Sequence, residues 1–327
     1  MQKRRNDIGW GIVLLWLTVM LHGCGTADSV PNAGKQEETP VVKPETRIVK
    51  TVHGDVEIPA NPQRIVTQGY LAQFLAFGVK PVGAPYWEIE SPHVKDLAAG
   101  IADIGQIDGG SVEKILALNP DLIVTVGGDE KLNEQYRKIA PTIVIPYGTY
   151  HEVHEEMKAF GQLLGKEQEA DNRLAAFDED VKQAKASIAG LVPAGTTFSI
   201  MGPFDKEFYI YGDGVNRGGQ AIYQQLGLTP PESVRTDLIQ KKVDAQSVST
   251  EKIAAYAGDY IFLDISGGAE FDESSPVWAS LDAVKNNRIF KLNPDRFWPY
   301  DPIAVQAQVK EVASMLQERL GEKKAQK

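Results

Sequence analysis

Residues 151–190 constrain the fold more than any other part of the sequence, because these 40 residues are rich in helix-forming side chains and hold no strand signal. Within them, Lys166–Ile188 contains no Gly or Pro and repeats apolar residues at helical spacing. At 1.5 Å per residue, one helix here would be about 35 Å long, about the width of a domain. The sequence therefore predicts two lobes, 47–165 and 191–327, joined by an interlobe helix over 166–190.

Short β-branched runs occur on both sides of this segment. Continuous apolar runs of this kind fit strands that are buried on both faces of a mostly parallel sheet. They alternate with helical patterns, so we expect two Rossmann-like α/β lobes. The expected strands are Arg64–Thr67, Asp121–Val126, Thr142–Ile145, Thr197–Met201, Glu207–Tyr211, Tyr260–Asp264 and Arg288–Lys291, after a hairpin over Arg47–Ile58. The expected helices besides 166–190 are Tyr70–Phe77, Val112–Leu118, Glu130–Ile139, Gly219–Leu226, Thr250–Tyr256 and Asp301–Leu320.

A weak internal repeat favours the same two-lobe organisation. The pattern Glu-Lys-Ile-x-Ala-x-x-x-Asp-x-Ile begins at Glu113 and again at Glu251. A period this long indicates duplicated lobes and not a solenoid of short units. A helix followed by a strand often looks like this, so the repeat alone does not decide between duplication and coincidence.

The first residues have the pattern of a lipoprotein signal peptide, assigned to 1–23. A basic start precedes a 14-residue apolar run, Ile8–Leu21, which is short for a membrane span and typical of a signal-peptide core. The single cysteine, Cys24, follows in a sequence that resembles a bacterial lipobox. Lipidation of Cys24 would hold the protein at the extracytoplasmic face of the cell membrane. Residues 24–46 contain three prolines and no periodicity, and are expected to form a flexible tether.

Charge and cysteine content exclude some classes of protein. Asp and Glu number 44 against 34 Lys and Arg, for a net charge of −10, which argues against nucleic-acid binding. One cysteine rules out a disulfide framework.

Several segments in order resemble one family. They include DVEIPANPQRIV, SVEKILALNPDLIV, YIYGDGVNRGGQAIYQQLGL and VWASLDAVKNNRIFKL. Over about Arg47–Leu320 the chain is similar to the ferric-siderophore substrate-binding lipoproteins of ABC importers. The part from Tyr209 to Gly227 most resembles members that bind hydroxamate siderophores. The resemblance implies a non-enzymatic, monomeric binding protein with a ligand cleft between two lobes joined stiffly by a helix. Its partners would be a ferric siderophore and an ABC permease with its ATPase.

A ferric siderophore arrives with its iron fully coordinated, so such a protein needs no metal ligand and no cofactor. It needs flat apolar surface and a few donors for the chelate oxygens. The best donor candidate is Arg217, which lies in a glycine-rich segment between a strand and a helix and corresponds to a chelate-contacting Arg of hydroxamate-binding relatives. Those relatives often carry Trp two residues earlier, where this chain has Val215.

Two further sets of residues are functional candidates. Aromatic residues expected near strand ends, where open α/β sheets bind ligands, are Tyr70, Tyr86, Trp87, Tyr147, Tyr209 and Trp298. Glu113 and Glu251 stand at matched points of the repeat. The resemblance implies that each docks into an Arg pocket of the permease.

Other functions remain as alternatives. His151 and His154 lie in a sequence close to the H-E-x-x-H motif of metalloproteases, but with the wrong spacing. The same fold could also carry haem, cobalamin or a free transition metal. We expect an oxygen-rich iron chelate of the hydroxamate or hydroxamate–carboxylate class.

Overall fold

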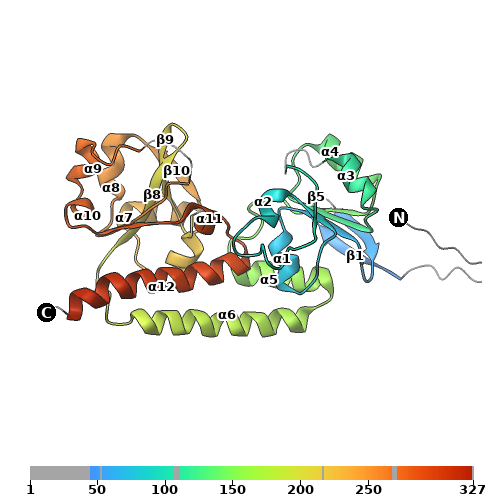
Figure 1. Cartoon of the computed structure of the whole chain (residues 1–327), viewed down its shortest axis with the longest axis horizontal. Coiled ribbons are helices and arrows are strands. Elements are labelled where there is room, and N and C mark those ends of the chain that lie inside the picture. Colours follow the sequence, from blue (N-terminus) through green and yellow to red (C-terminus); the bar gives the residue numbers. More distant parts are fainter. Residues whose placement is uncertain (1–44, 52–53, 107–110, 216, 267–270, 326–327) are drawn as a thin grey trace, which may run out of the picture. The chain divides into compact units, whose positions relative to one another are not determined.

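The first lobe is built on a parallel sheet with strand order β5-β4-β3-β6-β7 (Figure 1). The computed structural model describes residues 45–51, 54–106, 111–215, 217–266 and 271–325. Every residue of β3, β6 and β7 is buried, as the β-branched runs predict. The strands are β3 (Ile65–Gln68), β4 (Gly83–Ala84), β5 (Ala102–Asp103), β6 (Leu122–Thr125) and β7 (Thr142–Val144).

The second lobe carries a mixed sheet with strand order β10-β9-β8-β11-β12. The strands β8, β11 and β12 run parallel, whereas β9 is antiparallel to both of its neighbours. The bounds are β8 (Phe198–Phe204), β9 (Glu207–Tyr211), β10 (Ala245–Val248), β11 (Tyr260–Leu263) and β12 (Ile289–Lys291). The expected hairpin also forms, with β1 (Thr46–Thr51) antiparallel to β2 (Gly54–Pro59).

Helices surround both sheets, and most of the expected ones are present. In the first lobe they are α1 (Leu71–Ala76), α2 (Tyr86–Ile89), α3 (Val112–Ala117), α4 (Glu130–Arg137) and α5 (Val153–Leu164). In the second they are the π-helix η1 (Gln220–Gln225), α7 (Glu232–Asp237), the 3₁₀ turns η2 (Ile239–Lys241) and η3 (Thr250–Lys252), α8 (Ile253–Tyr256), α9 (Pro276–Ser280), α10 (Asp282–Lys285) and α11 (Pro294–Phe297).

Two long helices run beside each other, α6 (Glu167–Ile188) and α12 (Pro302–Ala325) (Figure 1). Gly165 ends α5 in the left-handed conformation, with φ 65°, and α6 starts two residues later. The buried side of α6 consists of the apolar residues at the predicted helical spacing, namely Ala170, Leu174, Phe177, Val181, Ala184 and Ile188. The fold class is therefore as predicted. The lobe boundaries at 165 and 190 stay predictions.

The helix α12 does more than the sequence suggested. It packs on α6 and also contacts α1 and α5 of the first lobe and η1 of the second. Its core residues belong to the largest buried cluster, together with side chains of α6 and of the second sheet. No helix within the described residues has both the length and the apolarity needed to cross a membrane.

The internal repeat corresponds to equivalent structure in the two lobes. Asp121 accepts hydrogen bonds from the backbone N–H groups of Gln63 (2.7 Å) and Arg64 (2.9 Å), just before β3. Asp259 accepts from the N–H (2.8 Å) and the hydroxyl (2.9 Å) of Thr197, just before β8. Asp121 comes just before β6 and binds the start of β3, and Asp259 comes just before β11 and binds the start of β8. In each lobe the two strands are parallel neighbours, so the matched Asp residues make equivalent hydrogen bonds.

Two buried carboxyl groups lie where α1, α2 and α5 meet. Glu88 accepts from the backbone N–H groups of Gly69 and Leu71, both at 2.8 Å, and Glu156 accepts from Gln73 Nε2 at 2.7 Å. Burial raises the pKa of Glu88 to about 7 and that of Glu156 to about 8. The folded protein therefore holds protons that the unfolded chain releases above about pH 4.3.

This difference predicts stability that falls as pH rises from about 5 to 8. Each carboxyl contributes up to about 1.4 kcal/mol per pH unit, because the folded state binds the extra proton. Glu156→Gln keeps an acceptor for Gln73 but cannot ionise, so its unfolding free energy should depend less steeply on pH in urea titrations between pH 5 and 8. The exposed neighbour provides the control, since Glu155→Gln should keep the wild-type slope. Equal slopes for wild type and Glu156→Gln would contradict the assignment.

Candidate functional site

The centre of the candidate site is a buried ion pair between Arg217 and Asp264. Arg217 Nε donates to Asp264 Oδ2 at 2.8 Å, and their side chains are 5% and 0% exposed. Asp264 also accepts from the hydroxyl (2.9 Å) and N–H (3.1 Å) of Ser266 and from the Tyr211 hydroxyl (3.3 Å). Burial, reinforced by the Asp264 charge, raises the pKa of Tyr211, so its hydroxyl remains a donor. Asp264 therefore accepts hydrogen bonds from Arg217, Ser266 and Tyr211.

Three aromatic rings surround the guanidinium group of Arg217. Its Cζ atom lies 3.7 Å from the centroid of Trp298 and 5.4 Å from those of Phe204 and Tyr211. The Trp298 ring also contacts Phe204, with 5.7 Å between centroids. Trp298 is 41% exposed, whereas Arg217 is 4% exposed. In this group, the Arg217 cluster, Trp298 is the most exposed side chain, and its indole stacks on the buried guanidinium.

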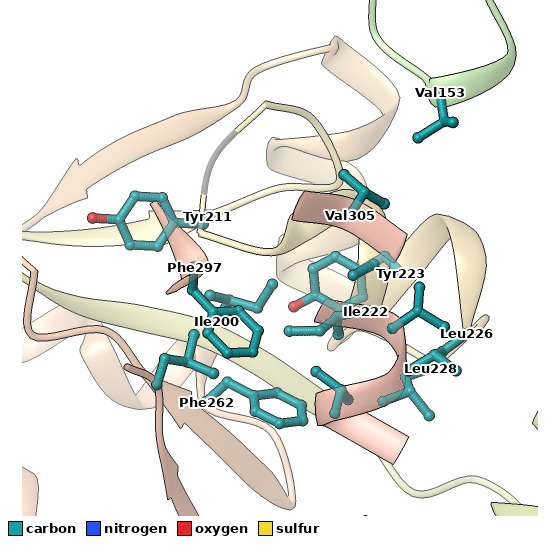
Figure 2. Packing of buried hydrophobic residues seen from close by; sticks show 14 of the residues in the cluster. Val153, Ile200, Tyr211, Ile222, Tyr223, Leu226, Leu228, Phe262, Phe297 and Val305 are labelled. Atoms are coloured by element: carbon teal, nitrogen blue, oxygen red, sulfur yellow. The ribbon is translucent and has the colours of Figure 1, made fainter. Parts of the chain in front are cut away.

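The neighbouring Phe297 holds Trp298 in place. Figure 2 shows the fully buried Phe297 ring packed among Ile200, Ile222 and Phe262. A Cβ atom on Gly218, the residue after Arg217, would lie 2.8 Å from the Phe297 ring. Gly218 also has φ +79°. The glycine segment therefore lets Phe297 approach, and this places Trp298 over Arg217.

The start of the same short helix is fixed by its sequence. Asn293 Oδ1 accepts from the N–H groups of Asp295 (3.1 Å) and Arg296 (3.3 Å), and Pro294 occupies the first turn of α11. From the first lobe, His93 Nε2 donates to the Arg296 carbonyl at 2.8 Å. The backbone before Trp298 is therefore held from both lobes.

Tyr147 is an exposed first-lobe residue that contacts the second-lobe side through Tyr300. It follows β7, is 57% exposed and meets the Tyr300 ring edge-on at 5.6 Å. Partial burial and the Asp244 carboxylate raise the pKa of Tyr147, while Arg217 lowers it. Both charges belong to the second lobe, so Tyr147 lies within electrostatic range of that lobe.

Tyr86 and Trp87 follow β4 and begin α2, with 47% and 39% exposure. The next residue, Glu88, ties α2 to the start of α1 through the two backbone hydrogen bonds described above. The exposed rings are thus carried by a short helix that is fixed to the start of α1, after the carboxyl end of β3. Sequence reasoning singled out the two rings but missed Glu88.

Two of the predicted aromatic residues have packing roles in the structure. Tyr70 is 4% exposed, donates to the Ile145 carbonyl at 2.7 Å and lies 5.4 Å from the Phe160 ring. It belongs to the core, and we do not propose that it contacts a ligand. Tyr209 lies within the antiparallel strand β9 and not at a strand end, and its ring joins the cluster through Phe204 and Tyr211.

Other expected features differ in detail. Val215, at the position where relatives often have Trp, is fully buried, so the aromatic surface here comes from Trp298. The helix expected after Gly219 forms as a π-helix. Cys24 lies outside the described residues.

Glu113 and Glu251 are exposed and locally equivalent. The Ser111 hydroxyl donates to Glu113 at 2.9 Å, and the N–H of Lys114 donates to Ser111 Oγ at 3.2 Å. The pKa of Glu113 is lowered by hydrogen bonds from its own backbone N–H and from the Ser111 hydroxyl, in that order of size. The pKa of Glu251 is lowered in the same way by its own N–H and by the Ser249 hydroxyl. Both carboxylates therefore remain charged at a fixed position on the surface.

The histidine pair does not share a helix face. His151 precedes α5, which starts at Val153, while His154 Nε2 lies 2.8 Å from Asp178 Oδ1 on α6. Across the described ranges, no group of three or more His, Cys, Asp and Glu side chains is placed to hold a metal ion.

Comparison with known proteins gives a consistent set of relatives. A family model for periplasmic binding proteins matches residues 65–296. The iron(3+)-hydroxamate-binding protein YxeB of Bacillus subtilis is 38% identical over 328 residues, covering 98% of this chain and 99% of the relative.

Solved structures agree. One is a FhuD fold-family periplasmic binding protein component of a Fep/Fec-like ferrichrome ABC transporter from Bacillus subtilis. It has a TM-score of 0.74 and 35% identity, and the match covers 83% of this chain and 100% of that one. Another is FhuD2 from Staphylococcus aureus with bound ferrioxamine B. It has a TM-score of 0.70 and 28% identity, covering 79% of this chain and 99% of that one.

Packing of Phe297 on Gly218 predicts the effect of adding one methyl group. Gly218→Ala strains a positive-φ residue and pushes on Phe297, so we expect a loss of about 3 kcal/mol in unfolding free energy and an altered Trp298 emission spectrum. Gly227→Ala is the matched control, because Gly227 has φ +71° but no atom within 4 Å of the added Cβ. It should lose about 1–2 kcal/mol and keep the wild-type spectrum. Equal losses for the two variants would refute the packing argument.

Proposed function

The chain belongs to the periplasmic binding protein family, and on this basis we propose that it is the extracytoplasmic substrate-binding component of an ABC importer for ferric siderophores of the hydroxamate class. It captures the iron chelate between its lobes and delivers it to the permease. It performs no chemistry on the ligand and carries no cofactor of its own.

The observation that carries this proposal is the exposed face of Trp298 stacked on Arg217, with the exposed Tyr147 of the other lobe packed on Tyr300, two residues after Trp298. A ferric hydroxamate complex presents apolar chelator arms and a few partly negative oxygens. Flat aromatic faces suit the arms, and the buried Arg217 guanidinium stacks under the Trp298 ring and holds it in place. Tyr86 and Trp87 add exposed aromatic surface at the carboxyl end of β4. The related proteins named above, which bind iron(3+)-hydroxamate and ferrioxamine B, support this class of ligand.

The location follows from the front of the sequence. A lipid on Cys24 would anchor the protein outside the cell membrane, and residues 24–46 would let it move over the surface. Appearance of the Cys24→Ala protein in the culture medium would support the anchor, and its retention on the membrane would count against it.

Ligand binding should quench tryptophan fluorescence. We expect saturable quenching when the soluble protein from Gly25 onward is titrated with ferrioxamine B, and weaker or no response to ferric catecholates, haem, cobalamin and free Fe³⁺ or Zn²⁺. Trp298→Phe should lose most of the quenching and bind several-fold more weakly, because a smaller ring covers Arg217.

A matched variant locates the effect. Trp278→Phe removes a tryptophan that is 2% exposed and lies in the core, so it should keep the quenching and the affinity. Absence of a response to every ferric hydroxamate, or tight binding of a bare metal ion, would overturn the proposed function.

The two surface glutamates should be needed for transport and not for binding. Charge reversal, Glu113→Lys or Glu251→Lys, is expected to abolish uptake of radiolabelled ferric siderophore by cells while leaving the dissociation constant unchanged, because two like charges would then face each other across the permease interface.

Glu134→Lys, on the exposed side of α4, makes the same charge change outside the repeat motif and should transport normally. A parallel loss of affinity in the Glu113 or Glu251 variants would instead assign these residues a structural role.

A further inference from the structure

The Arg217 cluster has an unusual balance of charge for a site that receives oxygen-rich ligands. Its guanidinium is paired with Asp264, which has no exposed surface. The ion pair carries no net charge, and one edge of the Arg217 fork is already occupied through Nε. A ligand that approaches Trp298 therefore meets a neutral pair and not a free cation.

Further acidic groups surround the pair. Asp244 Oδ1 occupies the space where a Cβ on Gly214 would lie, 1.7 Å from that position, so the missing side chain at Gly214 admits this carboxylate beside the Arg217 segment. Glu207 Oε2 accepts from the Tyr209 hydroxyl at 2.8 Å, at the outer side of the aromatic group. Asp213 is half-buried in the same segment.

Positive charge is scarce by comparison. The exposed Lys206 lies in the turn between β8 and β9, next to Asp205, and His151 lies near Asp213. Of the other basic residues in these segments, Arg296 pairs with Glu311 Oε2 of α12 and Lys241 with Asp237 Oδ1, while Lys242 is exposed two residues before Asp244. The described groups around the pair are therefore acidic on balance.

We propose that Asp264 sets the charge class of the ligand. By neutralising Arg217 inside an acidic surround, it makes the site accept neutral or cationic ferric chelates and reject anionic ones. This inference rests on the proposed function, and it assigns to Asp264 a role in specificity that is separate from holding Arg217 in position.

The physical basis is long-range electrostatics. Because Arg217 is paired, it does not attract an anionic ligand, and the carboxylates of Asp244 and Glu207 repel that ligand. The same two carboxylates attract a cationic ligand, which the paired Arg217 does not repel. Charges about 7 Å apart in a medium of effective dielectric constant about 20 interact strongly enough to change binding by about tenfold or more. A neutral chelate is affected least.

The test uses one iron core at two charges. Ferrioxamine B carries a free ammonium group and one positive charge, and its N-succinyl derivative carries one negative charge on the same ferric tris-hydroxamate. Dissociation constants for both come from calorimetric titration of the soluble protein. We expect wild type to bind the cationic form about tenfold more tightly than the anionic form.

Asp264→Asn should bring that ratio close to one, mainly by strengthening binding of the anionic ligand. The matched control is Glu232→Gln, the same charge change on α7. Glu232 lies near the opposite end of β8, since Thr229 pairs with Thr197 at the start of that strand. This control should keep the wild-type ratio.

Asp264→Asn also removes the counter-charge of a buried arginine, and this can prevent folding. In that case the double variant Asp244→Asn/Glu207→Gln is the test, because it leaves the Arg217–Asp264 pair intact. It should lower the preference for the cationic over the anionic ligand about threefold, because the anionic ligand then binds more tightly.

A wild-type ratio of one overturns the proposal, as does an unchanged ratio in folded Asp264→Asn. If Asp264→Asn does not fold, an unchanged ratio in the double variant overturns it instead. Failure of wild type to bind either form is a different result. It overturns the proposed function, and the assignment of Asp264 falls with it.

Discussion

The Arg217–Asp264 ion pair connects three segments that are far apart in the sequence. Arg217 comes from the glycine-rich segment after β9, Asp264 from the end of β11, and Trp298, which covers the pair, from the end of α11. A buried pair of this kind contributes little net stability compared with apolar packing, but removal of either charge is costly. The pair therefore specifies one arrangement of the three segments. The exposed aromatic surface depends on that arrangement.

The same organisation places the exposed aromatic rings and the two glutamates at different parts of each lobe. Residues at the carboxyl ends of the strands carry the aromatic rings, whereas Glu113 and Glu251 stand at the starts of helices that lead into β6 and β11. Asp121 and Asp259 perform the same capping role in each lobe. Similar sequence in the repeat thus corresponds to similar hydrogen bonding, which a short sequence match alone did not decide.

Sequence reasoning recovered the elements whose signals are local. Buried β-branched runs identified β3, β6, β7, β8 and β11 to within a few residues, and the apolar spacing of α6 identified its buried side. It missed β4 and β5, which have two residues each, and β10, in which no residue is buried and which becomes a strand by pairing with β9. Tertiary pairing creates these strands, so the local sequence does not contain the signal.

The candidate site shows the same limit. Arg217 and Trp298 could be singled out by residue type and position, but their stacking could not, because it depends on Phe297 packing against Gly218, 79 positions away. Tyr70 illustrates the opposite case. It comes just after β3, where a ligand-binding residue is expected, yet its hydroxyl donates a hydrogen bond to the Ile145 carbonyl inside the lobe. Residue type and position after a strand therefore do not distinguish an exposed tyrosine from a buried one whose hydroxyl has a hydrogen-bond partner in the core.

The position of Trp298 is set by two residues outside the aromatic surface. Asn293 starts the short helix, and Phe297 anchors its end in the core. The residue at 298 can therefore change in evolution without repacking the interior. The exposed ring and its buried anchor are adjacent residues, so a substitution at 298 changes the surface and leaves the scaffold as it is.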